Sequence, residues 1–196
     1  MGSVGQVMAA PSPQRKAVFL DRDGVLNRAV IRDGKPYPPA TVDEMQVLPR
    51  VEQALTALKT AGFLLIVVTN QPDVARGTTT RAAVDAIHEA LMTALPLDEI
   101  RCCFHDDHDA CSCRKPAPGA LLEAAAQHDV SLADSFMVGD RWRDIEAGHG
   151  AGVRTVLIDY AYCEQAASCL SDYVCGSLFD AAQWILSPKN QETTHA

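Results

Sequence analysis

The chain has 196 residues, of which 47% are hydrophobic and 21% are charged, and its formal net charge is −8 at pH 7. This size and composition are typical of one globular domain with a buried core. A negative surface repels a polyphosphate backbone, so a nucleic-acid partner is disfavoured, whereas a few Arg and Lys residues can still attract a small anionic substrate. No apolar stretch is long enough to span a membrane, and none demands a partner chain, so we expect a monomer with no membrane segment.

The seven cysteines form an odd set, and four of them lie between residues 102 and 113. A secreted disulfide framework usually has an even number of cysteines and follows a signal peptide. Residues 1–16 lack the apolar segment of a signal peptide. We therefore expect a reducing cytoplasm, in which the clustered cysteines bind a metal rather than form bridges.

The first elements expected along the chain are a strand, a helix and a second strand. Residues 1–16 contain Gly, Ser and Pro and are expected to form a flexible leader. The apolar run 17–20 has the character of a short buried strand, and the run 63–68 has the pattern of a strand covered on both faces. Between them, Pro49 is well placed to begin a helix that Gly62 would end.

Helices and strands continue to alternate in the rest of the chain. Thr79 or Thr80 caps the next helix. The further expected elements are, in chain order, a strand over 100–104, a helix over 119–128, a strand over 136–138, a helix over 144–151 and a strand over 155–158. This alternation predicts an α/β fold, a Rossmann-like three-layer sandwich with a mainly parallel sheet, in a single domain over 17–187 with a flexible tail over 188–196. The loop over 27–48 is too short to fold independently, so no large cap domain is expected.

Three clusters of polar residues follow predicted strands. Asp21 and Asp23 come directly after the first strand, Thr69 and Asn70 after the second, and Asp140 after the strand over 136–138. In a parallel sheet, ligands bind beyond the carboxyl ends of the strands. The three clusters are therefore expected to converge on one edge of the sheet and to form a catalytic site there.

These residues, with two cations further along the chain, suit a phosphate ester. The hydroxyl of Thr69 and a side-chain or backbone donor of Asn70 can donate hydrogen bonds to phosphate, although both residue types are also common in turns. Lys115 offers a compact positive charge and Arg114 a planar fork suited to phosphate, whereas the plainer alternative is a solvated basic pair.

The carboxylates of the same clusters suit a magnesium ion. Mg²⁺ prefers oxygen ligands and often uses one or two carboxylates together with substrate phosphate and water. Asp21, Asp23 and Asp140 can form such a shell. Asp144 can orient it, or it can simply cap the helix that it begins.

A short segment before Arg114 is rich in candidate zinc ligands. They are Cys102, Cys103, His105, His108, Cys111 and Cys113. Three thiolates and one imidazole are a common tetrahedral set for structural zinc, and the alternative is a group of reduced thiols. Because Arg114 and Lys115 follow directly, a zinc-stapled loop would hold both cations in place.

The order Asp-x-Asp, Thr, Lys and Gly-Asp-x-x-x-Asp resembles that of the haloacid dehalogenase-like phosphatases, over residues 17–184. The resemblance implies an aspartyl-phosphate intermediate, with Asp21 as the nucleophile and Asp23 as general acid and then general base. It also implies that Asp23 binds magnesium through its backbone carbonyl. Thr69 and Lys115 would stabilise the phosphoryl oxygens as charge develops.

Four segments, 21–27, 69–71, 75–77 and 113–116, resemble a subfamily, the D-glycero-D-manno-heptose 1,7-bisphosphate phosphatases with the related histidinol-phosphate phosphatases. The zinc ligands that this resemblance implies are Cys103, His105, Cys111 and Cys113. The implied substrate contacts are Asp21, Asp23, Thr69, Asn70, Gln71, Arg114, Lys115 and Arg141. Pro72 and Asp73 depart from the pattern of the subfamily, so some substrate contacts are expected to differ.

The function implied by the resemblance is removal of the 7-phosphate of a heptose 1,7-bisphosphate in nucleotide-heptose biosynthesis. Histidinol phosphate or another small phosphorylated metabolite is the alternative substrate. An alternative of another class is a catalytically silent zinc-binding interaction module, against which the intact Asp21, Asp23, Lys115 and Asp140 argue.

Overall fold

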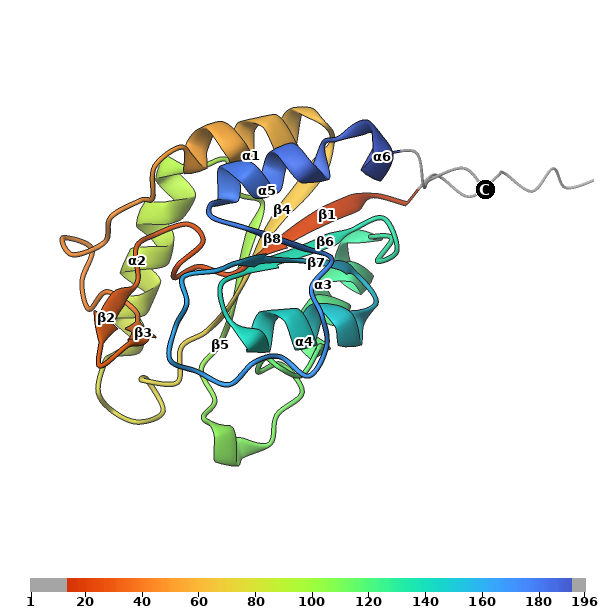
Figure 1. Ribbon diagram of the computed structural model, residues 1–196. Helices are drawn as coiled ribbons and strands as arrows, with labels where there is room; N and C mark the ends of the chain where they lie inside the picture. The colour runs from red at the N-terminus through yellow and green to blue at the C-terminus, as the bar shows by residue number, and fades with distance from the viewer. Residues whose placement is uncertain (1–13, 192–196) are drawn as a thin grey trace, which may run out of the picture.

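The structure, a computed structural model, describes residues 14–191 and is built on one six-stranded parallel sheet (Figure 1). Its strands lie in the order β5-β4-β1-β6-β7-β8. Their bounds are β1 Lys16–Leu20, β4 Phe63–Asn70, β5 Glu99–Cys103, β6 Phe136–Gly139, β7 Arg154–Ile158 and β8 Tyr173–Cys175. The predicted parallel α/β sandwich is thereby confirmed.

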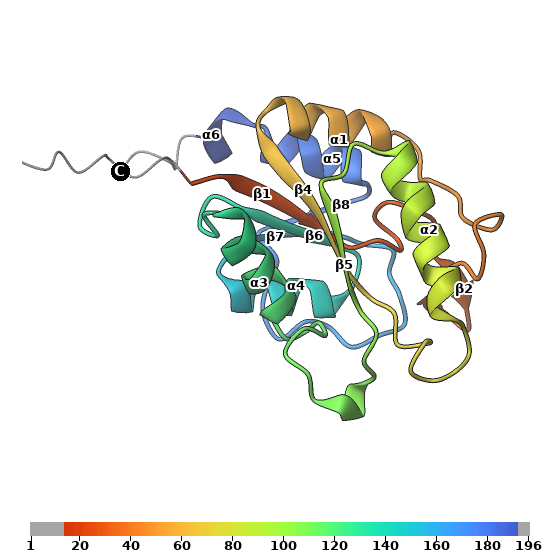
Figure 2. The ribbon, with the colours of Figure 1, turned by 180° about the vertical axis from the view of Figure 1, so that it is seen from behind.

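Helices cover both faces of the sheet, as the two opposite views show (Figures 1 and 2). One face packs against α1 (Val51–Thr60), α2 (Arg81–Ala94) and α5 (Leu178–Ile185). The other face packs against α3 (Gly119–His128) and α4 (Trp142–Ala151). A short 3-10 helix, η1 (Asp107–Asp109), precedes α3, and α6 (Pro188–Gln191) follows α5.

The two cores explain why the central strands read as continuous apolar runs. Along β1, Val18 and Leu20 point into the core beneath α1 and α5, while Ala17 and Phe19 point into the core beneath α3 and α4. Successive side chains of a strand face opposite sides of the sheet, so a strand covered on both faces has no position for a polar residue. The first polar side chain after this run, Asp21, thus marks the edge of the sheet.

Local signals set the ends of the helices. Thr80 is the N-cap of α2, where its hydroxyl accepts a hydrogen bond from the backbone N–H of Ala83 at 3.1 Å. The helix expected over 144–151 begins earlier, at Trp142. Asp144 therefore lies inside the first turn, and its carboxylate accepts a hydrogen bond from the backbone N–H of Arg141 at 3.0 Å.

The segment 27–48 contains a small hairpin that the sequence analysis did not predict. Strands β2 (Val30–Arg32) and β3 (Lys35–Tyr37) pair antiparallel. Asp33 and Gly34 form the turn between them, and both have positive φ angles. Asp-Gly between short strands is a recognised hairpin signal. The segment is much smaller than a domain, in agreement with the expected absence of a large cap.

The ends of the described chain differ from the expected boundaries. Residues 1–13 of the expected leader and 192–196 of the expected tail lie outside the described residues, whereas β1 begins at Lys16. The chain is helical over Pro188–Gln191, where Asn190 donates a hydrogen bond to the carbonyl of Trp184 at 2.7 Å. Among the helices described, none combines the length and apolar character needed to cross a membrane.

Candidate active site

The candidate site lies where the central strand β1 ends between β4 and β6. Leu20, the last residue of β1, is in register with Val67 of β4 and Val138 of β6. From β1 the chain first adds β4 and β5 on one side of β1, and later adds β6, β7 and β8 on the other side. The strand order therefore reverses at β1, and a parallel sheet opens a crevice for ligands at such a point. A small hollow here is lined by Asp21, Asp23, Pro36, Tyr37, Pro38, Thr69, Asn70, Lys115, Arg141, Arg143 and Asp144.

Lys115 lies at the centre of the polar contacts in this hollow. Its buried Nζ lies 2.8 Å from Oδ1 of Asp21 and 2.5 Å from Oδ1 of Asp144. Burial by itself lowers the pKa of Lys115, but the negative charges of Asp144 and Asp21 outweigh it and hold the pKa above its usual value. The lysine therefore stays charged and lies directly beside the carboxylate of Asp21.

Asn70 holds the backbone of Lys115 in this position. Its side-chain oxygen accepts a hydrogen bond from the backbone N–H of Lys115 at 3.1 Å, and its Nδ2 donates to the carbonyl of the same residue at 2.9 Å. We expected Asn70 to donate to phosphate. Both ends of its side chain bind the loop that carries Lys115, and donation from the backbone of Asn70 to phosphate stays a prediction.

Three buried carboxylates, those of Asp21, Asp140 and Asp144, form a group that fits a cation. One oxygen from each lies within 4.8 Å of the others. Burial raises the pKa of Asp21 to about 6, while Lys115 opposes that rise and Asp144 adds to it. Burial and the charges of Asp21 and Asp144 also raise the pKa of Asp140 well above its usual value. Such an excess of buried negative charge is relieved by a bound cation.

The surroundings of Asp140 also point to an ion. Its Oδ2 accepts a hydrogen bond from the hydroxyl of Tyr162 at 2.9 Å, but no donor among the described residues reaches its buried Oδ1. Buried oxygens without a donor are rare and call for an explanation, of which a bound ion is one. Gly24 has a φ of 85°, and a Cβ at that position would lie 1.9 Å from Oδ2 of Asp140. Only glycine therefore allows the backbone to approach this carboxylate.

Asp23 is held by side-chain donors on several sides. Arg22 donates from Nε and Nη2 to both carboxylate oxygens at 2.8 to 3.2 Å. Asn27 donates to Oδ1 at 2.8 Å, and Gln71 donates to Oδ2 at 2.9 Å. The amide nitrogen of Gln71 also lies 3.0 Å from the hydroxyl of Thr69, and its side chain is buried. Gln71, expected to bind substrate, is thus engaged with Asp23 and Thr69.

The side chain of Arg22, which was not predicted to belong to the site, is fully buried. Arg22 follows Val18 and Leu20 in the alternation that points every second side chain of β1 into the same core, and it lies between two aspartates in the sequence. A cation at such a place must have a buried partner, and this is the signal that could have identified it.

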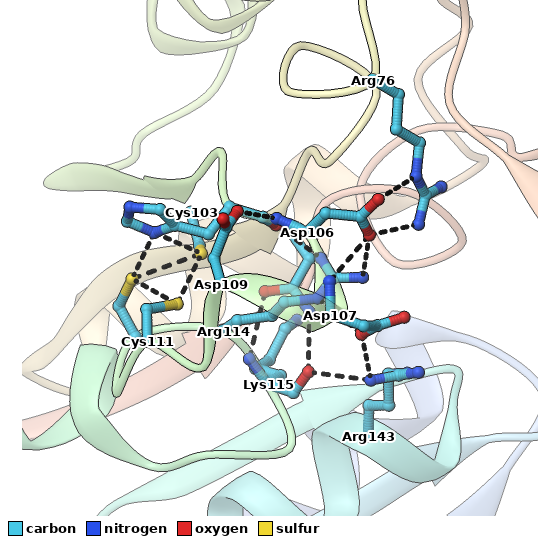
Figure 3. Close-up of polar contacts among 12 residues, drawn as sticks. Arg76, Cys103, Asp106, Asp107, Asp109, Cys111, Arg114, Lys115 and Arg143 are labelled. Atoms are coloured by element: carbon cyan, nitrogen blue, oxygen red, sulfur yellow. Dashed lines mark hydrogen bonds and ion pairs between the residues drawn. The ribbon is translucent and has the colours of Figure 1, made fainter.

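The four cysteine and histidine residues selected for zinc do come together. Atoms of Cys103, His105, Cys111 and Cys113 that can bind a metal lie within 4.8 Å of one another, and five of the pairs are 3.2 to 3.7 Å apart (Figure 3). A zinc–sulfur bond of about 2.3 Å gives tetrahedral edges of about 3.8 Å. These residues therefore fit a four-coordinate metal. All seven cysteines are free thiols, so no bridge competes for them.

The two competing ligands lie outside this group. The side chain of His108 is 80% exposed and faces Asp109. Burial raises the pKa of Cys102 to about 12 and also raises that of Cys103, so it is the position of Cys102 outside the group that separates the two thiols.

A second, cationic hollow opens beside the first. It shares Asn70, Arg141 and Arg143 with the first hollow and extends to Arg76 and Arg114. Arg114 is largely buried and donates from Nε to Asp107 at 2.9 Å, and Arg141 pairs with Glu164. Arg143 was not predicted, although it lines both hollows together with Arg141, the N-cap of α4.

Comparisons with known proteins agree with this geometry. A HAD-hydrolase-like family model matches residues 112–181. The D-glycero-beta-D-manno-heptose-1,7-bisphosphate 7-phosphatase of Rhodopseudomonas palustris is 34% identical over 158 residues, which make up 74% of this chain and 84% of the relative. The enzyme of the same name from Escherichia coli is 36% identical over 183 residues, covering 86% of this chain and 93% of the relative. The chain belongs to this phosphatase family.

A solved structure of the family is also similar. The D,D-heptose 1,7-bisphosphate phosphatase of Bordetella bronchiseptica, crystallised with magnesium and phosphate, matches with a TM-score of 0.72 and 32% sequence identity, over 87% of this chain and 98% of that chain. The resemblance inferred from the motifs is thus confirmed. As a member of this family, the protein is a phosphatase that hydrolyses a phosphate ester.

Proposed function

We propose that the protein removes the 7-phosphate of D-glycero-β-D-manno-heptose 1,7-bisphosphate, a step in nucleotide-heptose biosynthesis. The observation that carries the proposal is the pairing of two hollows: the one around Asp21 and Lys115 suits the reacting phosphate, and the adjoining one suits a second phosphate. Relatives with this named activity support the same substrate. Histidinol phosphate has one phosphate, so it has no second anion that could bind in the arginine-rich hollow.

The reaction assigned to Asp21 and Asp23 proceeds in two balanced steps. A carboxylate oxygen of Asp21 attacks phosphorus while the bond from phosphorus to the sugar oxygen breaks, and Asp23 gives its proton to that oxygen. Water then attacks the aspartyl phosphate, gives a proton to Asp23, and releases inorganic phosphate with Asp21 restored. Two easier steps replace one difficult displacement.

The residues around Asp21 complete the site. Lys115 contacts Oδ1 of Asp21, which leaves the other carboxylate oxygen to attack. The ammonium of Lys115 and the hydroxyl of Thr69 are assigned to the phosphoryl oxygens, where preorganised donors stabilise developing charge. Asn70 and Gln71 position these groups rather than touch substrate. Arg114 and Arg141 are assigned to the second phosphate.

Two metals are assigned to the protein. Asp21, Asp140 and the backbone carbonyl of Asp23 would hold Mg²⁺, with Asp144 orienting the shell, and the bound ion supplies positive charge to the phosphoryl oxygens. Cys103, His105, Cys111 and Cys113 would hold structural Zn²⁺, because four protein ligands leave no open position for chemistry. We further infer a monomer acting in the cytoplasm, where a reducing environment keeps these thiols available.

The test is phosphate release from both anomers of heptose 1,7-bisphosphate, histidinol phosphate and other sugar phosphates, with magnesium present. We expect the β-anomer to give the highest kcat/KM and Asp21→Asn to abolish turnover. Asp85→Asn is the matched control, since Asp85 is an exposed aspartate on α2 whose ion pair, within the described part of the chain, is with Arg81. A preference for histidinol phosphate would overturn the substrate, and full turnover by Asp21→Asn would overturn the mechanism. Failure of the unaltered protein to hydrolyse any ester would favour the silent zinc module.

A further inference from the structure

The arginines of the second hollow pair with carboxylates, as Figure 3 shows for Arg76, Arg114 and Arg143. Asp106 pairs with Arg76, Glu164 pairs with Arg141, and Asp107 pairs with both remaining arginines. The positive charge that should attract a second phosphate is therefore partly offset by the protein's own carboxylates, and Asp107 serves two of the arginines. An anion can enter only by competing with one of these carboxylates.

One oxygen of Asp107 accepts hydrogen bonds from two arginines, whereas Oδ1 of Asp106 is hydrogen-bonded to Arg76 and lies 3.9 Å from Nη2 of Arg114. Oδ1 of Asp107 accepts from Nε of Arg114 at 2.9 Å and from Nη1 of Arg143 at 3.2 Å. The Asp107 side chain is 56% exposed, whereas that of Arg114 is 10% exposed. The carboxylate is thus the movable partner, and the guanidinium of Arg114 is the fixed one.

The neighbouring Asp106 is held far more firmly. Its carboxylate receives two hydrogen bonds from Arg76 and one from the backbone N–H of Asp107, and its own side chain is only 13% exposed. Its backbone N–H in turn donates to Asp109 at 2.7 Å. Asp106 fixes the start of the η1 turn, and Asp107 projects from that turn towards the arginines.

The Arg114–Asp107–Arg143 group also adjoins the reaction centre. Nη1 of Arg143 lies 3.5 Å from the carbonyl of Lys115, whose Nζ contacts the proposed nucleophile, Asp21. A ligand anion placed between the guanidinium groups of Arg114 and Arg143 would thus bind close to the reacting phosphate.

We propose that the carboxylate of Asp107 stands in for the second phosphate of the substrate: it holds Arg114 and Arg143 together in the free enzyme and is displaced by the non-reacting phosphate. The inference rests on the proposed function, because it assumes a substrate with phosphates at both ends. A phosphate carries more charge than a carboxylate and has three free oxygens, so it can bind both arginines at once. The displaced Asp107 moves into water, where an exposed carboxylate is well solvated.

Asp107 is on this account a specificity-determining residue. A monophosphate leaves the Asp107 pairs intact and gains nothing from the second hollow, whereas a bisphosphate exchanges them for stronger contacts. Asp107→Asn keeps the size of the side chain but weakens its hold on the two arginines. The variant should therefore favour bisphosphates over monophosphates more strongly than the unaltered enzyme does.

The experiment measures competitive inhibition of p-nitrophenyl phosphate hydrolysis by glucose 1,6-bisphosphate and glucose 6-phosphate, which differ only in the second phosphate. For Asp107→Asn we expect the ratio of the two Ki values to shift about three- to tenfold towards the bisphosphate, as loss of one competing charge allows. The KM of Asp107→Asn for heptose 1,7-bisphosphate should also be lower than that of the unaltered enzyme. Asp109→Asn is the control, because it removes the same charge from the same turn and should leave the ratio unchanged.

Each result decides the matter. Weaker bisphosphate binding by Asp107→Asn would mean that Asp107 merely holds the arginines in place, and an equal shift with Asp109→Asn would reveal only a general effect of charge. Either result overturns the inference. If the unaltered enzyme fails to hydrolyse heptose 1,7-bisphosphate but the Ki ratio still shifts, the proposed substrate falls and the role of Asp107 stands. If that substrate is hydrolysed and the ratio does not move, the role of Asp107 falls alone.

Discussion

The guanidinium of Arg22 binds both carboxylate oxygens of Asp23, the next residue in the chain, and on its other side Nη1 lies 3.0 Å from Nε2 of His88. Arg22 is fully buried, and His88 comes from α2. Asp23, the proposed general acid and base, is therefore oriented by Arg22, which in turn contacts a histidine of α2. The side chain of Arg22 contacts Asp23 and His88 rather than Asp21, so the contacts of Asp21 do not reveal this arrangement.

Replacing Arg22 by lysine should reduce turnover while the fold persists. A lysine keeps the charge but cannot grip both oxygens of Asp23 in the fixed geometry of a guanidinium. We expect kcat to fall by about tenfold or more and the free energy of unfolding to fall by about 1–3 kcal/mol, as for loss of buried charge-assisted hydrogen bonds. Steady-state kinetics and urea denaturation measure both. Arg81→Lys is the control, since that exposed arginine pairs with Asp85 on the same helix and lies over the ring of Phe104; equal losses in the two variants would contradict the role of Arg22.

His88 should make the protein sensitive to acid. Burial and the positive charge of Arg22 lower the pKa of His88 to about 4 in the folded protein, against an ordinary value of 6.5. Between these pH values the unfolded chain binds a proton that the folded chain does not, so stability falls as the pH drops from 6.5 towards 4. In His88→Gln this dependence should be weaker.

Urea midpoints measured from pH 7 to pH 4 with magnesium present test that expectation. His149→Gln is the comparison, because His149 is exposed at the end of α4. The expectation is wrong if the midpoint of His88→Gln falls with pH as steeply as that of the unaltered protein.

Much of the candidate site follows from a few simple patterns in the sequence. The apolar runs that became β1, β4 and β6 placed Asp21, Thr69 and Asp140 at one edge of a parallel sheet, because such strands all end on the same side. Ligand chemistry alone left six candidates for zinc, and the resemblance to the subfamily selected the four residues that fit a metal. The placement of the polar clusters depended on periodicity, whereas the choice of zinc ligands depended on the resemblance.

The parts that could not be predicted depend on contacts between distant segments. Asn70 and Gln71 have the residue types of phosphate donors, yet their amides bind the backbone of Lys115 and the side chains of Asp23 and Thr69. Asp107 reads as an ordinary loop aspartate until folding brings it to Arg114 and Arg143. Strand β8, at three residues, is too short to carry a periodic signal.

Removing one thiol of the cysteine–histidine group should release zinc and disturb the nearby cations. Cys111→Ser leaves three ligands, and the loop that carries Arg114 and Lys115 loses its staple. We expect stoichiometric zinc in the unaltered protein by elemental analysis, and for the variant loss of zinc, a lower Tm and a higher KM. Cys102→Ser is the matched control, because Cys102 precedes the proposed zinc ligand Cys103 but lies outside the group. Zinc retained by Cys111→Ser, or lost equally from Cys102→Ser, would show the ligand set to be wrong.

Gly24 should be essential for binding magnesium rather than merely for the turn that it forms. A Cβ at Gly24 would lie 1.9 Å from Oδ2 of Asp140 and 2.5 Å from its Cγ, so Gly24→Ala must push that carboxylate away. Gly62 offers a matched control, because its φ of 87° equals the 85° of Gly24 within two degrees, yet nothing lies within 4 Å of a Cβ placed there. Both variants bear the strain of a left-handed alanine, about 1 kcal/mol. Only Gly24→Ala should lose affinity for Mg²⁺ in a calorimetric titration and, with it, most of the phosphatase activity. If the two variants bound magnesium equally well, Asp140 would not be the ligand that the geometry indicates.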